Sequence, residues 1–150
     1  MNSEVLNRQD LLFEEELILT EVKEYGFGWQ KFSSGKFPIP AEGLRFDIRF
    51  EGHMIGKRIN GHIEGVDHLT VRADGRLFLD LYASIKTKDG ASISVKESGI
   101  NAEGALRLGM DFHTSDPRYK WLNHKHVWGV GAVDFQSGTV KIKGYQNQNY

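Results

Sequence analysis

The chain has 150 residues, of which 39% are hydrophobic and 26% are charged, a composition that suits one folded domain and excludes a wholly disordered chain. Its 19 basic and 20 acidic residues give a formal net charge of -1, so the overall basic excess typical of nucleic-acid-binding proteins is missing. The lack of cysteine excludes disulfides, thiolate metal sites and cysteine nucleophiles. The sequence begins without a basic segment and apolar run, and no apolar stretch approaches the ~20 residues that span a bilayer. We therefore expect a cytoplasmic protein that binds neither membrane nor nucleic acid.

Short runs rich in Val, Ile, Leu, Phe and Tyr, separated by glycine-containing turns, predict an all-β protein. Residues 12–22 mix acidic and apolar side chains and fit a helix or a strand about equally; we predict a strand. Residues 31–43 predict a loop. From Leu44 to Glu51, apolar and charged residues alternate strictly, which predicts a strand with one buried face.

The Asp74-Gly75 pair predicts a hairpin, and two registers compete for it. A two-residue turn would pair Ala73 with Arg76, whereas a three-residue loop ending at Gly75 would pair Arg72 with Arg76. Because a shift of one residue turns every side chain to the other face, we predict the second register, which gives the cleaner apolar face. That face consists of Asp67, Leu69, Val71, Leu77, Leu79 and Leu81, and the outer face of His68, Thr70, Phe78, Asp80 and Tyr82.

Asp67 is the one charged residue on the predicted apolar face. A carboxylate buried without a partner is costly, so this group should have a partner or a raised pKa. Two interpretations stay open. Asp67 is either a functional group in a cavity or a residue at the barrel rim that accepts hydrogen bonds from a loop.

Further strands are predicted over residues 91–98, with Ile93 and Val95 inward, and over residues 127–134 and 139–145 around a turn at residues 136–138. Residues 99–109 predict a loop, and residues 1–10 and 146–150 are expected to fray. The whole chain, residues 1–150, is thus predicted to be a single antiparallel β-barrel domain of roughly eight or nine strands.

Three segments carry a resemblance to a known family: Asp74 to Asp80, Asp89-Gly90-Ala91, and Pro117 to Asn123 with the pattern Pro-Arg-Tyr-x-Trp-Leu-Asn. In this order and spacing they resemble the bacterial domain of unknown function 3237 family, over about residues 44–145. The resemblance implies a calycin- or lipocalin-like barrel and leaves the activity open. Where the family tends to have Gly-Gly-x-Asp-Trp, this chain has Glu64-Gly65-Val66-Asp67-His68, so a pocket wall shared by the family would differ here.

The segment Arg118 to Asn123 is a second candidate site. If it is extended, Tyr119, Trp121 and Asn123 share a face, which suits a pocket wall and equally a core ladder in which Asn123 holds a loop. The predicted ligand-binding set is Asp67, Leu69, Leu81, Tyr119, Trp121 and Asn123.

The histidines are weaker candidates. His62, Glu64 and His68 fall at even spacing, as metal ligands on one strand face would, but the glycines at 61 and 65 suggest a bend between the two histidines. We favour solvent-facing histidines and expect no metal and no cofactor. In the preferred register His68 faces Asp80, which suits the orienting half of a general base and, more simply, a cross-strand ion pair.

Two functions from different classes follow. The first is a pocket for a small apolar molecule, with isomerase or cyclase-type proton transfer by Asp67 as a variant. The second is a structural or assembly module that pairs into a homodimer through Phe78 and Tyr82 on its outer face. The first requires an open cavity touching Asp67, and the second a filled barrel with a broad exposed apolar patch. Whether the protein is an enzyme stays open.

Overall fold

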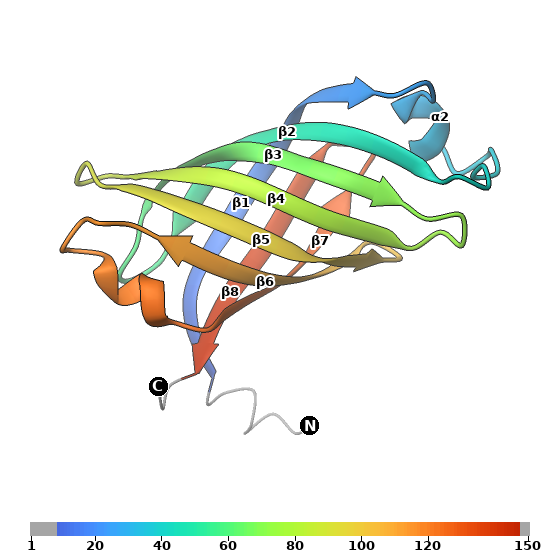
Figure 1. Ribbon diagram of the computed structural model, residues 1–150. Helices are drawn as coiled ribbons and strands as arrows, with labels where there is room; N and C mark the ends of the chain where they lie inside the picture. The colour runs from blue at the N-terminus through green and yellow to red at the C-terminus, as the bar shows by residue number, and fades with distance from the viewer. Residues whose placement is uncertain (1–8, 148–150) are drawn as a thin grey trace.

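In the computed structural model, which describes residues 9–147, eight antiparallel strands form a closed barrel (Figure 1). Each strand pairs with the next along the chain, and the first pairs with the last. The strands are β1 (Gln9–Glu24), β2 (Leu44–Ile55), β3 (Gly61–Val71), β4 (Leu77–Thr87), β5 (Ser92–Ala102), β6 (Ala105–His113), β7 (Val127–Asp134) and β8 (Thr139–Asn147). The predicted all-β barrel is confirmed, with eight strands.

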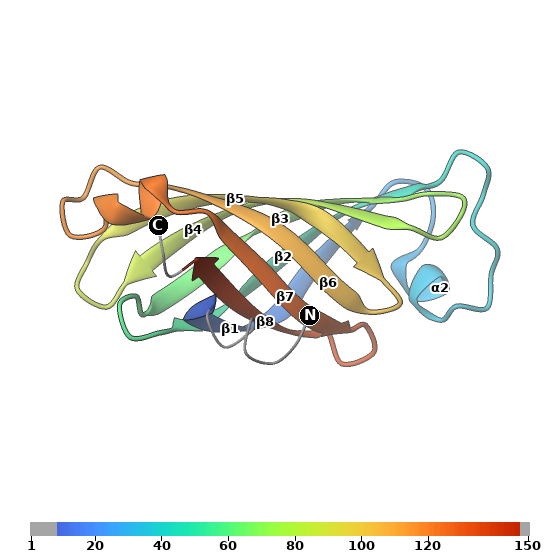
Figure 2. The same cartoon turned by 90° about the horizontal axis from the view of Figure 1, so that it is seen from below.

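Two short helices lie at opposite ends of the barrel (Figure 2). Helix α2 (Trp29–Ser33) belongs to the connection from β1 to β2, so it enters the first residues of the loop predicted for 31–43. The 3-10 helix η1 (Lys120–His124) belongs to the connection from β6 to β7. Neither helix is long and apolar enough to cross a membrane.

The hairpin between β3 and β4 adopts the predicted register. The Arg72 N–H donates to the Arg76 carbonyl over 2.8 Å, and the Gly75 N–H donates to the Arg72 carbonyl over 2.9 Å. Gly75 has a φ of 89°, in the left-handed region that glycine adopts without strain. The apolar face of the hairpin accordingly points into the barrel, and Asp67 points inward with it.

The loop predicted for residues 99–109 is wrong, because β5 and β6 form a hairpin there with only Glu103 and Gly104 in the turn. The glycines that suggested a loop lie within the strands instead. At Gly99 an added Cβ would lie 1.9 Å from the Arg107 carbonyl oxygen, so this glycine permits the close approach of β6.

The fraying expected near the termini does not extend to Gln9, Asp10, Gln146 and Asn147, which lie in paired strands. The Gln146 side chain is buried and donates to the Asp10 carboxylate over 2.8 Å. Residues 1–8 and 148–150, where fraying was also expected, lie outside the described residues.

Buried apolar side chains fill the barrel near η1, where Phe13, Met54, Ile59 and Leu122 are at most 1% exposed. A second cluster, centred on Phe46, lies toward α2 and packs against partly exposed aromatic side chains. The interior between these clusters is where a site can form.

Candidate functional site

A cavity of about 50 Å³ lies inside the barrel and is lined by side chains from most of its strands. Asp67 from β3 and Asn101 from β5 are its two polar lining residues among those described, and the others, such as Leu69, Leu81 and Phe135, are apolar. A space of this size holds a few water molecules, since one water needs roughly 10–15 Å³ on the same measure. A ligand as large as benzene, which fills an engineered cavity of about 150 Å³, would require lining side chains to move.

The Asp67 side chain combines burial with a single strong interaction. It is 7% exposed, and its Oδ1 accepts a hydrogen bond of 3.0 Å from the backbone N–H of Asp80 on β4. Burial raises the pKa of Asp67 to about 6, although the hydrogen bond from Asp80 acts in the opposite direction. The donor belongs to the facing strand rather than to a rim loop, so of the two interpretations the geometry favours the group in a cavity.

Two glutamates, Glu97 on β5 and Glu15 on β1, place further carboxyl groups inside the barrel, each 2% exposed. In the strand register Asp67 faces Leu81, and Leu81 faces Glu97. Burial and then the charge of Asp67 raise the pKa of Glu97 to about 7. Burial and then the charge of Glu97 raise the pKa of Glu15 well above its usual range. The interior therefore holds an interacting group of acids that resist ionisation together.

Each of the two glutamates has one carboxyl oxygen without a hydrogen-bond partner in the described part of the chain. Glu97 Oε1 and Glu15 Oε2 are buried and have no hydrogen-bond partner within the described part of the chain. Because an unsatisfied buried carboxylate is costly, protonation is the natural way to relieve it.

Sequence reasoning missed both glutamates, although a signal existed for one. The alternation that turns Ile93 and Val95 inward also turns Glu97 inward, two residues further on. Glu15 stands between two exposed glutamates in the run 14–16, so its direction becomes visible only once the register of β1 is known.

The α2 end of the cavity is covered by aromatic side chains. Trp29 packs against Phe46 and Phe135, with ring centroids 5.0 and 5.6 Å apart respectively, and Phe32 lies against the same two rings. The backbone N–H of Trp29 donates to the Glu24 carboxylate over 2.6 Å, and this hydrogen bond connects the first residue of α2 to the end of β1. Since Phe135 also lines the cavity, this aromatic cover forms part of its wall.

Of the predicted ligand-binding residues, Asp67, Leu69 and Leu81 line this cavity. The remaining three, Tyr119, Trp121 and Asn123, lie at the η1 end and do not line it. Their segment forms a turn and the 3-10 helix instead of the extended strand on which the shared face depended. Asn123 accepts from the Thr114 N–H over 2.9 Å and donates to the Thr114 carbonyl over 2.8 Å. The Tyr119 hydroxyl donates to the Asp89 carboxylate, and the Trp121 ring N–H donates to a nearby carbonyl. These contacts close the end of the barrel.

His68 has a different partner from the predicted Asp80. Its Nδ1 lies 2.8 Å from Asp47 Oδ1 on β2, directly opposite across the β2–β3 ladder. Hydrogen bonds from Tyr25 and then His68 lower the pKa of Asp47. The interaction lies on the outer face of the barrel, away from the cavity, and gives no general base there.

Comparison with known proteins confirms the family resemblance over part of the chain. The family model described as a protein of unknown function (DUF3237) matches residues 40–106, so the segment Pro117 to Asn123 lies outside the match. A Penicillium herquei protein named hydroalkoxylation enzyme phnH is 37% identical over 80 residues, which make up 53% of this chain and 51% of the relative. The chain therefore matches about half the length of that relative.

Solved structures share the fold. A β-barrel-like protein from Acinetobacter baumannii AYE has a TM-score of 0.75 and 24% identity, with 92% of this chain and 94% of that chain covered. A protein of unknown function from Clostridium acetobutylicum has a TM-score of 0.74 at 21% identity, covering 92% and 97%. An enzyme from Penicillium herquei has a TM-score of 0.66 at 23% identity, covering 91% and 92%.

Proposed function

We propose that this chain, with residues 40–106 matching the DUF3237 family, binds a small and mostly apolar molecule in the barrel cavity and transfers a proton to it from Asp67. The observation that carries the proposal is a buried carboxyl group in the wall of an otherwise apolar cavity, with its pKa raised to about 6. Such a group changes protonation near neutral pH, as an efficient general acid or base must.

The name of the Penicillium herquei relative supports one reaction class, the addition of a hydroxyl group across a carbon–carbon double bond. In that reaction a carbon–oxygen bond forms, the π bond breaks, and the hydroxyl proton is replaced by a proton on the second carbon. Protonated Asp67 would deliver the proton to carbon and regain one from the reacting hydroxyl, so the carboxyl group returns to its starting state. The balance needs no oxidant or reductant.

Glu97 is a second buried acid beside Asp67. Burial and then the charge of Asp67 raise the pKa of Glu97 to about 7, so Glu97 also retains its proton at a pH where an exposed carboxyl group has lost it. A protonated acid close to neutral pH is what proton delivery to carbon requires. Asn101, the other polar group in the wall, is held in place because its Oδ1 accepts a hydrogen bond from the Gly104 N–H.

The first test is the substitution Asp67→Asn, with Asp111→Asn as the matched control. Asn keeps an oxygen that can accept the Asp80 N–H but loses the transferable proton, and Asp111 is exposed on the outer face of β6, away from the cavity. An ortho-hydroxychalcone is larger than the cavity, so lining side chains must move to admit it. We expect the wild type and Asp111→Asn to accelerate closure of this chalcone to its flavanone, and Asp67→Asn to lose at least about 100-fold of that acceleration. The ring closure is followed by absorbance.

A second test does not depend on the chalcone being a substrate. It is an NMR titration of the Asp67 carboxyl group, without and with ortho-allylphenol. We expect Asp67 to titrate near pH 6 and to shift when the phenol binds. An Asp67 pKa in the ordinary range that does not shift when the phenol is added would overturn the proposal, as would an acceleration of chalcone closure that is equal in Asp67→Asn and Asp111→Asn.

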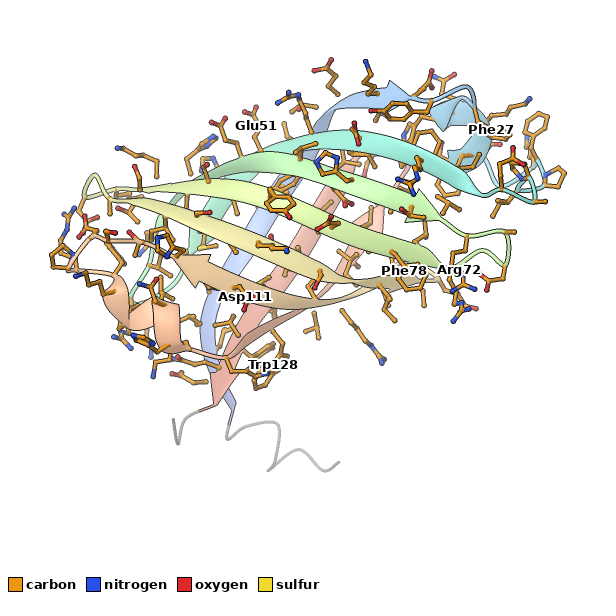
Figure 3. The ribbon with its side chains drawn as sticks, viewed as in Figure 1. Phe27, Glu51, Arg72, Phe78, Asp111 and Trp128 are labelled. Atoms are coloured by element: carbon orange, nitrogen blue, oxygen red, sulfur yellow. The ribbon has the colours of Figure 1, made fainter. Side chains whose placement is uncertain are left out.

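A second candidate, assembly into a homodimer, is favoured by exposed apolar residues on the outer face. Phe78 on β4 faces Ile100 on β5, and they are 36% and 41% exposed. Figure 3 shows Phe78 and Arg72 side by side on this surface, and the Arg72 guanidinium lies 5.6 Å from the Phe78 ring centroid. Sedimentation of the wild type and Ile100→Lys separates the possibilities: a dimer lost in the variant supports assembly, and a wild-type monomer rejects it.

A further inference from the structure

Two pairs of facing residues lie side by side on the outer surface of β2 and β3. Glu51 faces Glu64 across the ladder, and His53 faces His62 in the next outward row. The alternation of the strands turns these four side chains away from the core, and Figure 3 shows Glu51 projecting outward from the barrel. Side-chain ligand atoms of Glu51, His62 and Glu64 lie within 4.8 Å of one another.

This arrangement brings like charges together. Carboxylates directly opposite on neighbouring strands repel each other, and the flanking residues in that row, Ile18 on β1 and Ser84 on β4, are uncharged. One compensating group is His62, whose Nε2 lies 3.8 Å from Glu64 Oε2 and which is charged only when protonated. Lys86 on β4 lies opposite His62 in the next outward row. A bound cation would remove this repulsion.

The set also has the composition and access that a metal site needs. Imidazole nitrogen and carboxylate oxygen are ligands of zinc and related divalent ions, which prefer four ligands in a tetrahedral arrangement. Glu51, His53 and His62 border one surface hollow, so ions in solution can reach them. The side chains of His62 and Glu64 are 44% and 66% exposed.

We propose that Glu51, His62 and Glu64 bind a divalent transition-metal ion of the zinc type, with His53 as the fourth ligand. Ligand atoms around tetrahedral zinc are roughly 3.3 Å apart at bond lengths near 2.0–2.1 Å. Rotation of exposed side chains brings the three groups from within 4.8 Å to that spacing while the strands stay fixed. The His53 ring centroid is 6.1 Å from that of His62, within reach of the same ion.

The ligand set differs from the one that the sequence spacing suggested. His62 and Glu64 belong to it, but His68 is bound to Asp47, and His53 comes instead from the neighbouring strand. Strand β3 is continuous through Gly65, and His62 and Glu64 lie on its outer face. The site lies on the outer surface, and its ion would link β2 to β3 without entering the cavity.

The test is calorimetric titration of zinc chloride into the full chain, with the variants His62→Ala and Glu64→Gln and the control His126→Ala. His126 is also exposed but lies just before β7, so its removal leaves the proposed site intact. We expect one zinc ion per wild-type chain with a dissociation constant in the micromolar range. Both site variants should weaken binding by at least about tenfold, because each removes a ligand, whereas the control should bind as the wild type does.

A thermal melt with and without zinc provides a second readout, since an ion that binds only the folded chain raises its melting temperature. The increase should appear in the wild type and the control and disappear in His62→Ala. Absence of zinc binding to the wild type, or equal binding by wild type and His62→Ala, would overturn the proposal. Unchanged affinity in His53→Ala would remove the fourth ligand and contradict the four-residue site as stated.

Discussion

At the η1 end the barrel is filled by fully buried side chains and secured by specific hydrogen bonds, whereas at the α2 end it is covered by aromatic side chains that remain partly exposed. Leu122 is 0% exposed at the first end, and Asn123 holds the adjoining loop with two hydrogen bonds. At the second end Trp29 and Phe32 lie over Phe135 without becoming buried. The cavity borders the lightly covered end. The two ends thus differ in how tightly side chains close the barrel.

The largest expected effect tests the filled end. Leu122→Ala should lower the free energy of unfolding by about 2–5 kcal/mol, because it leaves a void among tightly packed neighbours. Leu79→Ala is the matched control, because Leu79 lines the existing cavity and is already partly exposed. Urea unfolding of both variants measures the difference, and equal losses would contradict the contrast between the two ends.

The next largest effect concerns the acids inside the barrel and is a dependence of the free energy of unfolding on pH. Between about pH 4 and pH 7 folded Asp67 and Glu97 retain protons that the unfolded chain has released, so stability should fall as pH rises through this window. For either group alone the full change is on the order of 3 kcal/mol. Glu97→Gln should flatten the dependence of stability on pH, measured by urea unfolding at about pH 5 and about pH 8. Glu14→Gln, which alters an exposed neighbour of Glu15, should leave the dependence of stability on pH unchanged. The same pH dependence in both variants would show that Glu97 is not a source of it.

The smallest effect tests the aromatic cover. Trp29→Ala should cost only roughly 1–2 kcal/mol, since it removes ring contacts from a partly exposed position. The same change should speed exchange of ortho-allylphenol with the cavity, observed by NMR line shape. Lys31→Ala, a change on the exposed side of α2, is the control. Slower or unchanged exchange in Trp29→Ala would place the entrance elsewhere.

Local patterns sufficed to predict much of the barrel. Alternation identified β2, and the choice of the cleaner apolar face gave the β3–β4 register and the inward direction of Asp67. The turn at Glu103 and Gly104 was missed, because glycines that allow strands to approach each other closely look the same in a sequence as glycines that form loops.

The acids inside the barrel were harder to predict, because Glu15 and Glu97 come from β1 and β5 and meet only when the barrel closes. On the outer surface, likewise, His53 and His62 face each other across β2 and β3 only once the register of those strands is known. The aromatic residues of the η1 segment had a recognisable composition, but composition does not distinguish a wall that binds a ligand from a plug that closes a barrel.

The hydrogen bond from the Asp80 N–H to Asp67 connects a backbone amide on β4 to the charge state of the buried carboxyl group. The ladder pairs Asp67 with Leu81 and Thr70 with Phe78, and between these pairs the Asp80 amide points to a side chain instead of to a facing carbonyl. A charged carboxylate accepts a stronger hydrogen bond than a neutral acid does. The proton resonance of one backbone amide on β4 should therefore move as the interior gains or loses a proton, so that the charge state of the hidden acid can be followed in the intact protein without any label inside it.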